Sequence, residues 1–196
     1  MPHANRSDSS TLAANLIDEQ LRTLPISIAA IAQAFASGVI EPVPLQRKLR
    51  LVKTGSGGNI VADDAPPSAG EIPPSIPRTP HLQAECLRVV VSNALLTVGM
   101  FMKEHDMLSM RTPEFQFLGH VVVAILNGNR FRVAPGYMPT ASFDGLVIDA
   151  SLDGMPLLGD GQIKGFIELG DAIALLQWLA RYLRGEKNYV SGGDAG

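Results

Sequence analysis

The stretch that decides the fold runs from Thr112 to Phe131 and reads TPEFQFLGHVVVAILNGNRF. Its first residues are typical of a helix start, because Thr112 can cap free backbone N–H groups and Pro113 fits the first turn. The apolar residues that follow predict a helix as far as Leu126, and the pair Asn127-Gly128 is typical of a helix end.

Two further helical stretches precede this helix. Residues Leu12 to Ser37 and His81 to Met110 carry apolar residues near a helical period, and Pro25 predicts a kink or a break in the first stretch. The second stretch is expected to face a partner helix with one apolar stripe. That stripe consists of Leu82, Cys86, Val89, Val90, Leu96 and Met100.

The pattern changes after the central helix. Polar and apolar residues alternate from Arg130 to Val133, which predicts a short strand. The segments Gly145–Ser151 and Met155–Leu158 flank the pair Asp153-Gly154, a strong hairpin signal. A final helix is expected to start from a cap at Asp171. Its apolar side is formed by Ile173, Leu175, Leu176, Leu179, Tyr182 and Leu183.

These patterns predict a mainly α protein, an antiparallel helical bundle with a small C-terminal β-hairpin. We expect an N-terminal helical segment over residues 1–52, a Gly/Pro-rich linker or loop over 53–80, a helical core with the hairpin over 81–184, and a flexible tail over 185–196. The linker is predicted from composition, because its 28 residues contain four glycines, six prolines and three serines without an apolar period.

Two alternative roles for the linker depend on its residues. The glycines of Thr54–Asn59 could cradle a phosphate, but the Lys-Ser/Thr pair of a P-loop is absent there. The Pro-rich stretch Ala65–Pro80 could instead be presented to a partner as an extended peptide, which would make the protein an adaptor.

Charge and composition limit the classes of function. The formal net charge is −3, from 16 basic and 19 acidic residues, which argues against broad electrostatic binding to nucleic acid. The single cysteine, Cys86, excludes an intramolecular disulfide. The N-terminus lacks the pattern of a signal peptide, and no apolar run reaches the length of about 18 residues that is typical of a membrane span. We therefore predict a cytoplasmic protein without a membrane partner.

The residues that could carry chemistry are scattered. The four histidines, His3, His81, His105 and His120, are not spaced to share a helix face as metal ligands. The sequence therefore predicts no metal site and no cofactor, and it assigns no catalytic residue. An enzyme with an unrecognised site near His120 and the acidic residues of the hairpin remains an alternative.

The central helix resembles the motif helix of HEPN-like proteins, the higher-eukaryote and prokaryote nucleotide-binding superfamily. In several bacterial branches that helix reads like Glu-Phe-x-Phe-Leu-x-His-Ile-Arg-Asn-Ala-x-Ala-His-Gly-Asn-x-Phe. The resemblance covers residues 82–184 and includes the hairpin and the last helix. The matching positions are Glu114, Phe115, Phe117, Leu118, His120, Ala124, Gly128, Asn129 and Phe131.

The departures from this motif bear on function. The family's ribonuclease signature is an Arg followed by four to six residues and a His, which support a phosphate and assist attack by a 2′-hydroxyl. Here Val122 stands at the Arg position, Val123 at the Asn position and Asn127 at the His position. The resemblance therefore implies a scaffold without the nuclease groups.

A polar groove is the remaining candidate site. His120 and Asn127 are seven residues apart on one helix face, where they could line a groove with Asn129 and Arg130. The alternative interpretation is that His120 is a hydrogen-bonded boundary residue and that Asn127-Gly128 only ends the helix. Together these observations predict a non-catalytic HEPN-like binding or dimerisation module, partnered by its own copy or another protein, with weak RNA contact.

Overall fold

The computed structural model describes residues 6–37, 80–134 and 139–186. Within these ranges the chain is mainly helical, with a small two-stranded antiparallel sheet near the C-terminus, as the sequence predicted. Most of the predicted linker over residues 53–80, including Thr54–Asn59, lies outside the described residues. Most of the predicted tail over 185–196 lies outside them as well.

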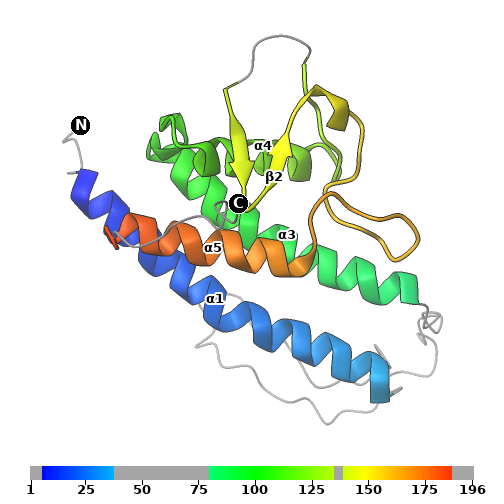
Figure 1. Cartoon of the computed structure of the whole chain (residues 1–196). Coiled ribbons are helices and arrows are strands. Elements are labelled where there is room, and N and C mark those ends of the chain that lie inside the picture. Colours follow the sequence, from blue (N-terminus) through cyan, green and yellow to red (C-terminus); the bar gives the residue numbers. More distant parts are fainter. Residues whose placement is uncertain (1–5, 38–79, 135–138, 187–196) are drawn as a thin grey trace, which may run out of the picture.

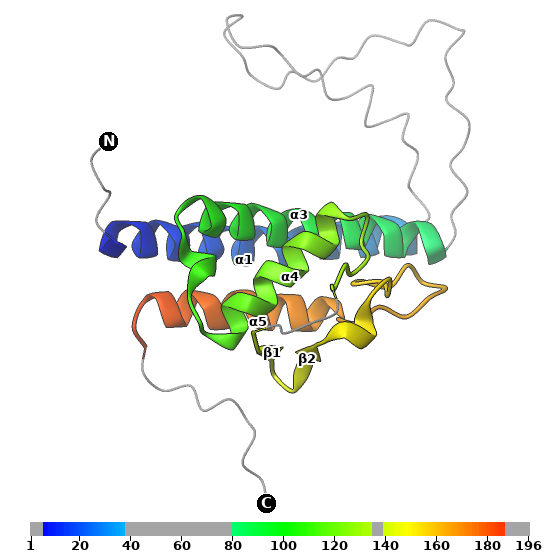
Figure 2. The same cartoon turned by 90° about the horizontal axis from the view of Figure 1, so that it is seen from above.

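Three long helices form the body of the molecule. Helix α1 spans Arg6–Ser37, α3 spans Pro80–Glu104 and α5 spans Leu169–Leu183. Figure 1 shows that α1 runs opposite to α3 and α5, and that α4 and the hairpin lie on the far side of α3 and α5 from α1. Seen from above in Figure 2, α4 crosses the body obliquely between α3 and α5.

Helix α1 passes through Pro25 without a break. The expected break is therefore wrong, and the helix also begins six residues before Leu12. Pro25 lies on the exposed side, while Ala13, Ile17 and Leu24 of the opposite side are buried in the core. Leu24 before Pro25 is buried and Ile28 after it packs partly buried against the core, which holds the helical conformation against the loss of one backbone hydrogen bond.

Helix α3 supplies the centre of the core. Its buried side chains recur at helical spacing on one face and comprise Val91, Ala94, Leu95, Val98 and Met102. This is not the predicted stripe, of which Val89 and Met100 are exposed. The helix ends at Glu104 rather than Met110, because Asp106 has a left-handed φ of 54° and a 3-10 turn follows over Met107–Ser109. By length and composition alone α3 could cross a membrane, but a core helix of a water-soluble protein satisfies the same criterion.

Helix α4 spans Pro113–Leu126 with Thr112 as its N-cap residue, so its predicted bounds are confirmed. The Thr112 hydroxyl makes no capping bond and lies 3.5 Å from the hydroxyl of Tyr182. Helix α4 crosses α3 at Gly99, where a Cβ atom would lie 2.1 Å from Cγ2 of Val122. This position therefore has no room for a side chain.

The hairpin forms at a different turn from the one that the sequence predicted. Strand β1 spans Ala141–Phe143 and β2 spans Leu146–Ile148, with Asp144 and Gly145 at φ values of 47° and 80° between them. Two positive φ values are typical of a type I′ turn, so this Asp-Gly pair connects the strands. The pairs in register are Ala141 with Ile148, Ser142 with Val147 and Phe143 with Leu146.

The other Asp-Gly pair has a different role. The Val133 backbone N–H donates to Asp153 Oδ1 over 2.9 Å, and the Gly154 N–H donates to the Phe131 carbonyl over 2.9 Å. The predicted strand over 130–133 is not a strand, since only an isolated bridge joins Arg130 to Pro156. Asp153-Gly154 thus fastens the segment after α4 to the loop before α5.

Helix α5 begins two residues before the expected cap. Glu168 is its N-cap residue, and Asp171 is the third residue of the helix. The Glu168 N–H donates to Asp171 Oδ2 over 2.8 Å, which satisfies a backbone donor at the helix start. The buried side chains of α5 and α1 belong to one core with α3 and α4.

Candidate functional site

Asn129 is the most constrained residue of the predicted groove. Its φ is 66°, and its side-chain amide donates to the Leu158 carbonyl over 2.7 Å. The Leu158 N–H in turn donates to Asn129 Oδ1 over 3.0 Å. An asparagine tolerates this left-handed backbone better than most residues, so Asn129 ties the end of α4 to the loop that precedes α5.

Two more of the predicted residues make backbone contacts close by. Arg130 Nη1 donates to the Gly154 carbonyl over 2.7 Å, and Asn127 Nδ2 donates to the Arg130 carbonyl over 3.1 Å. Both side chains are exposed. Their present hydrogen bonds hold the turn after α4 in place.

His120 is half-buried on α4, and burial lowers the pKa of its imidazole below 6.5. It does not line either of the two hollows described below. Asn129 and Arg130 do line the smaller hollow, of about 70 Å³, together with Arg88, Gly128 and Asp160. Two of the four predicted groove residues therefore line the hollow, and Asn127 contacts the Arg130 backbone beside it, whereas His120 does not line it.

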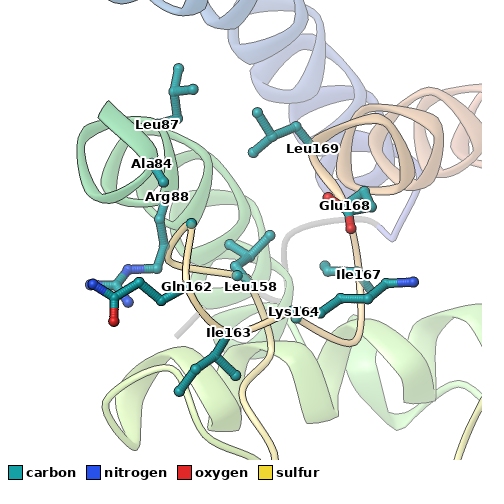
Figure 3. Close-up of a pocket in the computed structure, with 13 residues that line it drawn as sticks. Ala84, Leu87, Arg88, Leu158, Gln162, Ile163, Lys164, Ile167, Glu168 and Leu169 are labelled. Carbon is teal, nitrogen blue, oxygen red and sulfur yellow. The ribbon is translucent and has the colours of Figure 1, made fainter. Parts of the chain in front are cut away.

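A larger pocket adjoins this hollow. Its volume is about 450 Å³, and it lies between α3, the loop over residues 158–167 and the start of α5 (Figure 3). Leu158 lies between the two helices, with Leu87 on α3 and Leu169 on α5. Arg88, Leu158 and Ile163 line both the pocket and the smaller hollow, so the two are neighbours.

The loop that forms one wall of the pocket is closed by contact between two glycines. A Cβ on Gly165 would lie 2.3 Å from the backbone N of Gly159, and 2.5 Å and 2.6 Å from backbone atoms of Leu158. The Ile167 N–H donates to the Leu157 carbonyl over 2.9 Å beside this contact. The backbones at the two ends of the loop therefore touch directly, and a side chain at residue 165 would separate them.

Asp160 shapes the tip of the same loop. Its Oδ1 accepts hydrogen bonds from the N–H groups of Ile163 and Gln162, over 2.8 Å and 2.9 Å, and these bonds lower the pKa of its carboxyl. The Asp160 carbonyl accepts a 2.7 Å hydrogen bond from Nδ1 of His81. The first turn of α3 is thus fastened to the loop.

The charged groups of the pocket come from three elements. Arg88 lies on α3, Lys164 on the loop and Glu168 at the start of α5. Arg88 has one ion pair, with Glu85 over 3.7 Å, and both side chains are partly exposed. Lys164 has no ion pair among the residues that the structure describes.

The described lining suits binding better than nucleophilic catalysis. It includes aliphatic side chains, three glycines, Gln162 and the three charged residues, but no hydroxyl, thiol or imidazole. No group of three or more His, Cys, Asp or Glu residues in the described ranges could hold a metal ion. The pocket can therefore offer an apolar surface and charged hydrogen-bonding groups to a ligand.

Sequence reasoning missed the residues that line this pocket. No pattern in the sequence singles out Arg88 on α3, or Lys164 and Glu168 in the segment before α5. The available signal was the spacing of glycines in Gly159–Gly165, which reads GDGQIKG. The glycines of Thr54–Asn59 drew the phosphate hypothesis instead, and they lie outside the described residues.

Comparison with known proteins identifies no relative. No family model matches the chain, and neither the curated proteins nor the solved structures contain a significant match. The HEPN-like resemblance accordingly stays a prediction.

Proposed function

We propose that this chain is a non-catalytic, HEPN-like helical module that associates with a second copy of itself through the exposed side of α4. The observation that carries the proposal is an apolar stripe on an otherwise well-buried helix. The stripe consists of Gly119, Val123 and Leu126, which are four and three residues apart. Val123 is 45% exposed and Leu126 is 61% exposed. Residues at this spacing lie on one helix face.

The neighbouring helix carries a further exposed apolar residue one position after its contact with α4. Gly99 of α3 contacts Val122 of α4, and the next residue of each helix is an exposed apolar one, Met100 and Val123. Met100 is 42% exposed. We call Met100, Gly119, Val123 and Leu126 the α4 face. Scattered exposed apolar residues are ordinary, but a group around one helix crossing favours an interaction surface.

The charge of α4 favours a second copy as the occupant. Glu114, in the first turn, is the only formally charged residue of the helix, and the pKa of His120 is lowered. In a symmetric dimer the same surface meets itself, so a face with fixed charges would bring like charges together. Gly119 adds to the fit, because nothing lies within 4 Å of the place of its missing Cβ. Two helices can approach closely at such a position.

The resemblance agrees with this assignment of roles. The residues that match the HEPN-like motif lie on α4 and directly after it, whereas the Arg and His positions of the ribonuclease signature hold Val122 and Asn127. Val122 is buried against α3. These substitutions support a module that binds without cleaving RNA.

Light scattering coupled to size-exclusion chromatography tests the proposal over a dilution series of the full chain. We expect a dimer that Leu126→Asp converts to monomer. Loss of one buried leucine is worth about 2 kcal/mol per copy, so the dimer should weaken by roughly a thousandfold. The matched control is Ile26→Asp, which changes a residue that is 70% exposed on α1, the helix that lies on the other side of α3 and α5 from α4 (Figure 1).

The two variants separate the possible results. Circular dichroism first establishes that each variant keeps its helices. A wild-type monomer at all concentrations would contradict self-association, and dissociation by Ile26→Asp but not by Leu126→Asp would place the interface elsewhere. RNA contact is tested on the same samples by fluorescence anisotropy with a labelled single-stranded RNA. We expect binding that is lost at moderate salt.

A further inference from the structure

The pocket beside α3 has the features of a small-molecule site, independently of the α4 face. Its volume of about 450 Å³ falls within the range of ligand pockets. Its walls are held by backbone contacts, since Gly165 meets Gly159 and the Asn129 side chain holds Leu158 at both its N–H and its carbonyl. A pocket with walls fixed in this way needs little ordering when a ligand binds.

The apolar part of the lining fits an aliphatic group. Leu87 from α3, Leu158 from the loop and Leu169 from α5 surround the space from three elements, and Ala84 leaves room between them. Leu158 is itself 2% exposed, so its side chain forms part of the core beneath the pocket. Burial of each CH₂ group of a hydrocarbon chain against such a surface is favourable.

The polar part of the lining favours one negative charge. Arg88 and Lys164 supply two cations and Glu168 one carboxylate, so the lining itself has an excess of one positive charge, and Arg88 also pairs with Glu85 outside the lining over 3.7 Å. Figure 3 shows the side chains of Arg88 and Gln162 extending in the same direction, while Lys164 extends the opposite way. Arg88 and Gln162 both carry N–H donors, and a guanidinium matches the two oxygens of a carboxylate.

We propose that this pocket binds a small aliphatic monocarboxylate, whose chain lies against Leu87, Leu158 and Leu169 and whose carboxylate is held by Arg88 with help from Gln162. Glu168 disfavours ligands with several negative charges, because they would meet its carboxylate at the opposite wall. Lys164 adds to the positive potential of the pocket without being the anchor of the carboxylate.

Isothermal titration calorimetry of the full chain with sodium octanoate tests the proposal. Three comparison ligands vary one feature each. Octylamine has a positive charge, octanol has no charge, and inorganic phosphate has no hydrocarbon chain. We expect one octanoate site per chain, weaker binding of octanol, and no binding of octylamine or phosphate. Equal binding of octanol and octanoate, preference for octylamine, or no octanoate binding would overturn the proposal.

Three variants locate the ligand. Arg88→Gln removes the charge but keeps an amide of similar reach, and it should weaken octanoate binding about tenfold to a hundredfold. Lys164→Gln is the matched control that removes the other cation, and its effect should be severalfold smaller. Ala84→Leu fills the space between the helices and should abolish binding whatever the charge of the ligand.

The oligomeric state provides an independent check. Octanoate binding should be the same in the Leu126→Asp variant, because the α4 face contributes no residue to the pocket. Octanoate affinity unchanged by both Arg88→Gln and Ala84→Leu would exclude this pocket as the site. An equal loss in Lys164→Gln and Arg88→Gln would remove Arg88 as the anchor.

Discussion

Replacing Gly165 by alanine should destabilise the protein more than any other single-methyl addition at a described glycine of the pocket wall. The added Cβ would lie 2.3 Å from the Gly159 nitrogen and within 2.6 Å of two Leu158 backbone atoms. Ordinary contacts begin near 3.4 Å, so the two ends of the loop must separate by about 1 Å. Rotation of a side chain cannot relieve this overlap, because all three neighbouring atoms belong to the backbone.

The expected magnitude follows from the hydrogen bonds beside the contact. The N–H groups of Phe166 and Ile167 donate to the carbonyls of Pro156 and Leu157 over 3.0 Å and 2.9 Å. A separation of about 1 Å breaks both bonds, and each broken bond that leaves a partly buried group unsatisfied costs about 1–3 kcal/mol. The alanine also restricts the unfolded chain, which offsets about 0.4–1 kcal/mol. We expect a net destabilisation of roughly 1–5 kcal/mol.

Urea unfolding followed by circular dichroism measures this change, at one protein concentration so that any dimerisation affects all samples equally. The matched control is Gly170→Ala, because nothing lies within 4 Å of the added methyl in the first turn of α5. The control should be neutral or more stable by up to about 1 kcal/mol. If the close-contact reasoning holds, Gly165→Ala should also lose octanoate binding. A Gly165→Ala protein as stable as the control would refute the reasoning.

Three further predictions concern single residues. Asn129→Ala should lower the free energy of unfolding by about 1–3 kcal/mol, because both hydrogen bonds to Leu158 are lost. Asn127→Ala removes one exposed hydrogen bond and should lower it by less than half as much. Similar losses for the two variants in urea unfolding would contradict this prediction. The pKa of His120 is lower folded than its ordinary 6.5, so the unfolded state binds more protons, and stability should fall as the pH drops below 6.5 toward the folded pKa. His120→Gln should remove that part of the pH dependence in urea titrations, and an unchanged profile would exclude His120 as its source. Pro25→Ala should stabilise the protein by about 1–3 kcal/mol, because a proline inside a helix costs up to about 3 kcal/mol. The urea midpoint should therefore rise. A lower midpoint would show that Pro25 contributes packing instead.

Local signals predicted α4 well. Pro113 in the first turn and the Asn127-Gly128 pair mark the two ends of the helix through local backbone preferences, which depend on a few adjacent residues, although Thr112 occupies the N-cap position without a side-chain capping bond. The same kind of reasoning failed at the hairpin, because Asp144-Gly145 and Asp153-Gly154 carry identical turn signals. Only the pairing of β1 with β2, and their packing over α4, decides which pair connects the strands.

The pocket was beyond local reasoning for a different reason. Arg88 and Lys164 lie far apart in the sequence, and their common location depends on how α3 meets the loop before α5. Of the four predicted groove residues, only Asn129 and Arg130 line the hollow, for a similar reason. The spacing of His120 and Asn127 was read correctly as two helical turns, but the hollow opens beyond the end of α4, where Asn129 and Arg130 lie.

Helix α1 is synthesised well before α5, one of the helices that bury its apolar side. Ala13, Ile17 and Leu24 of α1 are buried together with residues of α3 and α5, and α5 begins only at Leu169. A ribosome that adds about 5–20 residues per second leaves this apolar side of α1 without its last partner for on the order of ten seconds. During that interval the apolar side of α1 in the newly made chain is exposed to water, where it is prone to aggregate and open to chaperones that bind exposed apolar segments.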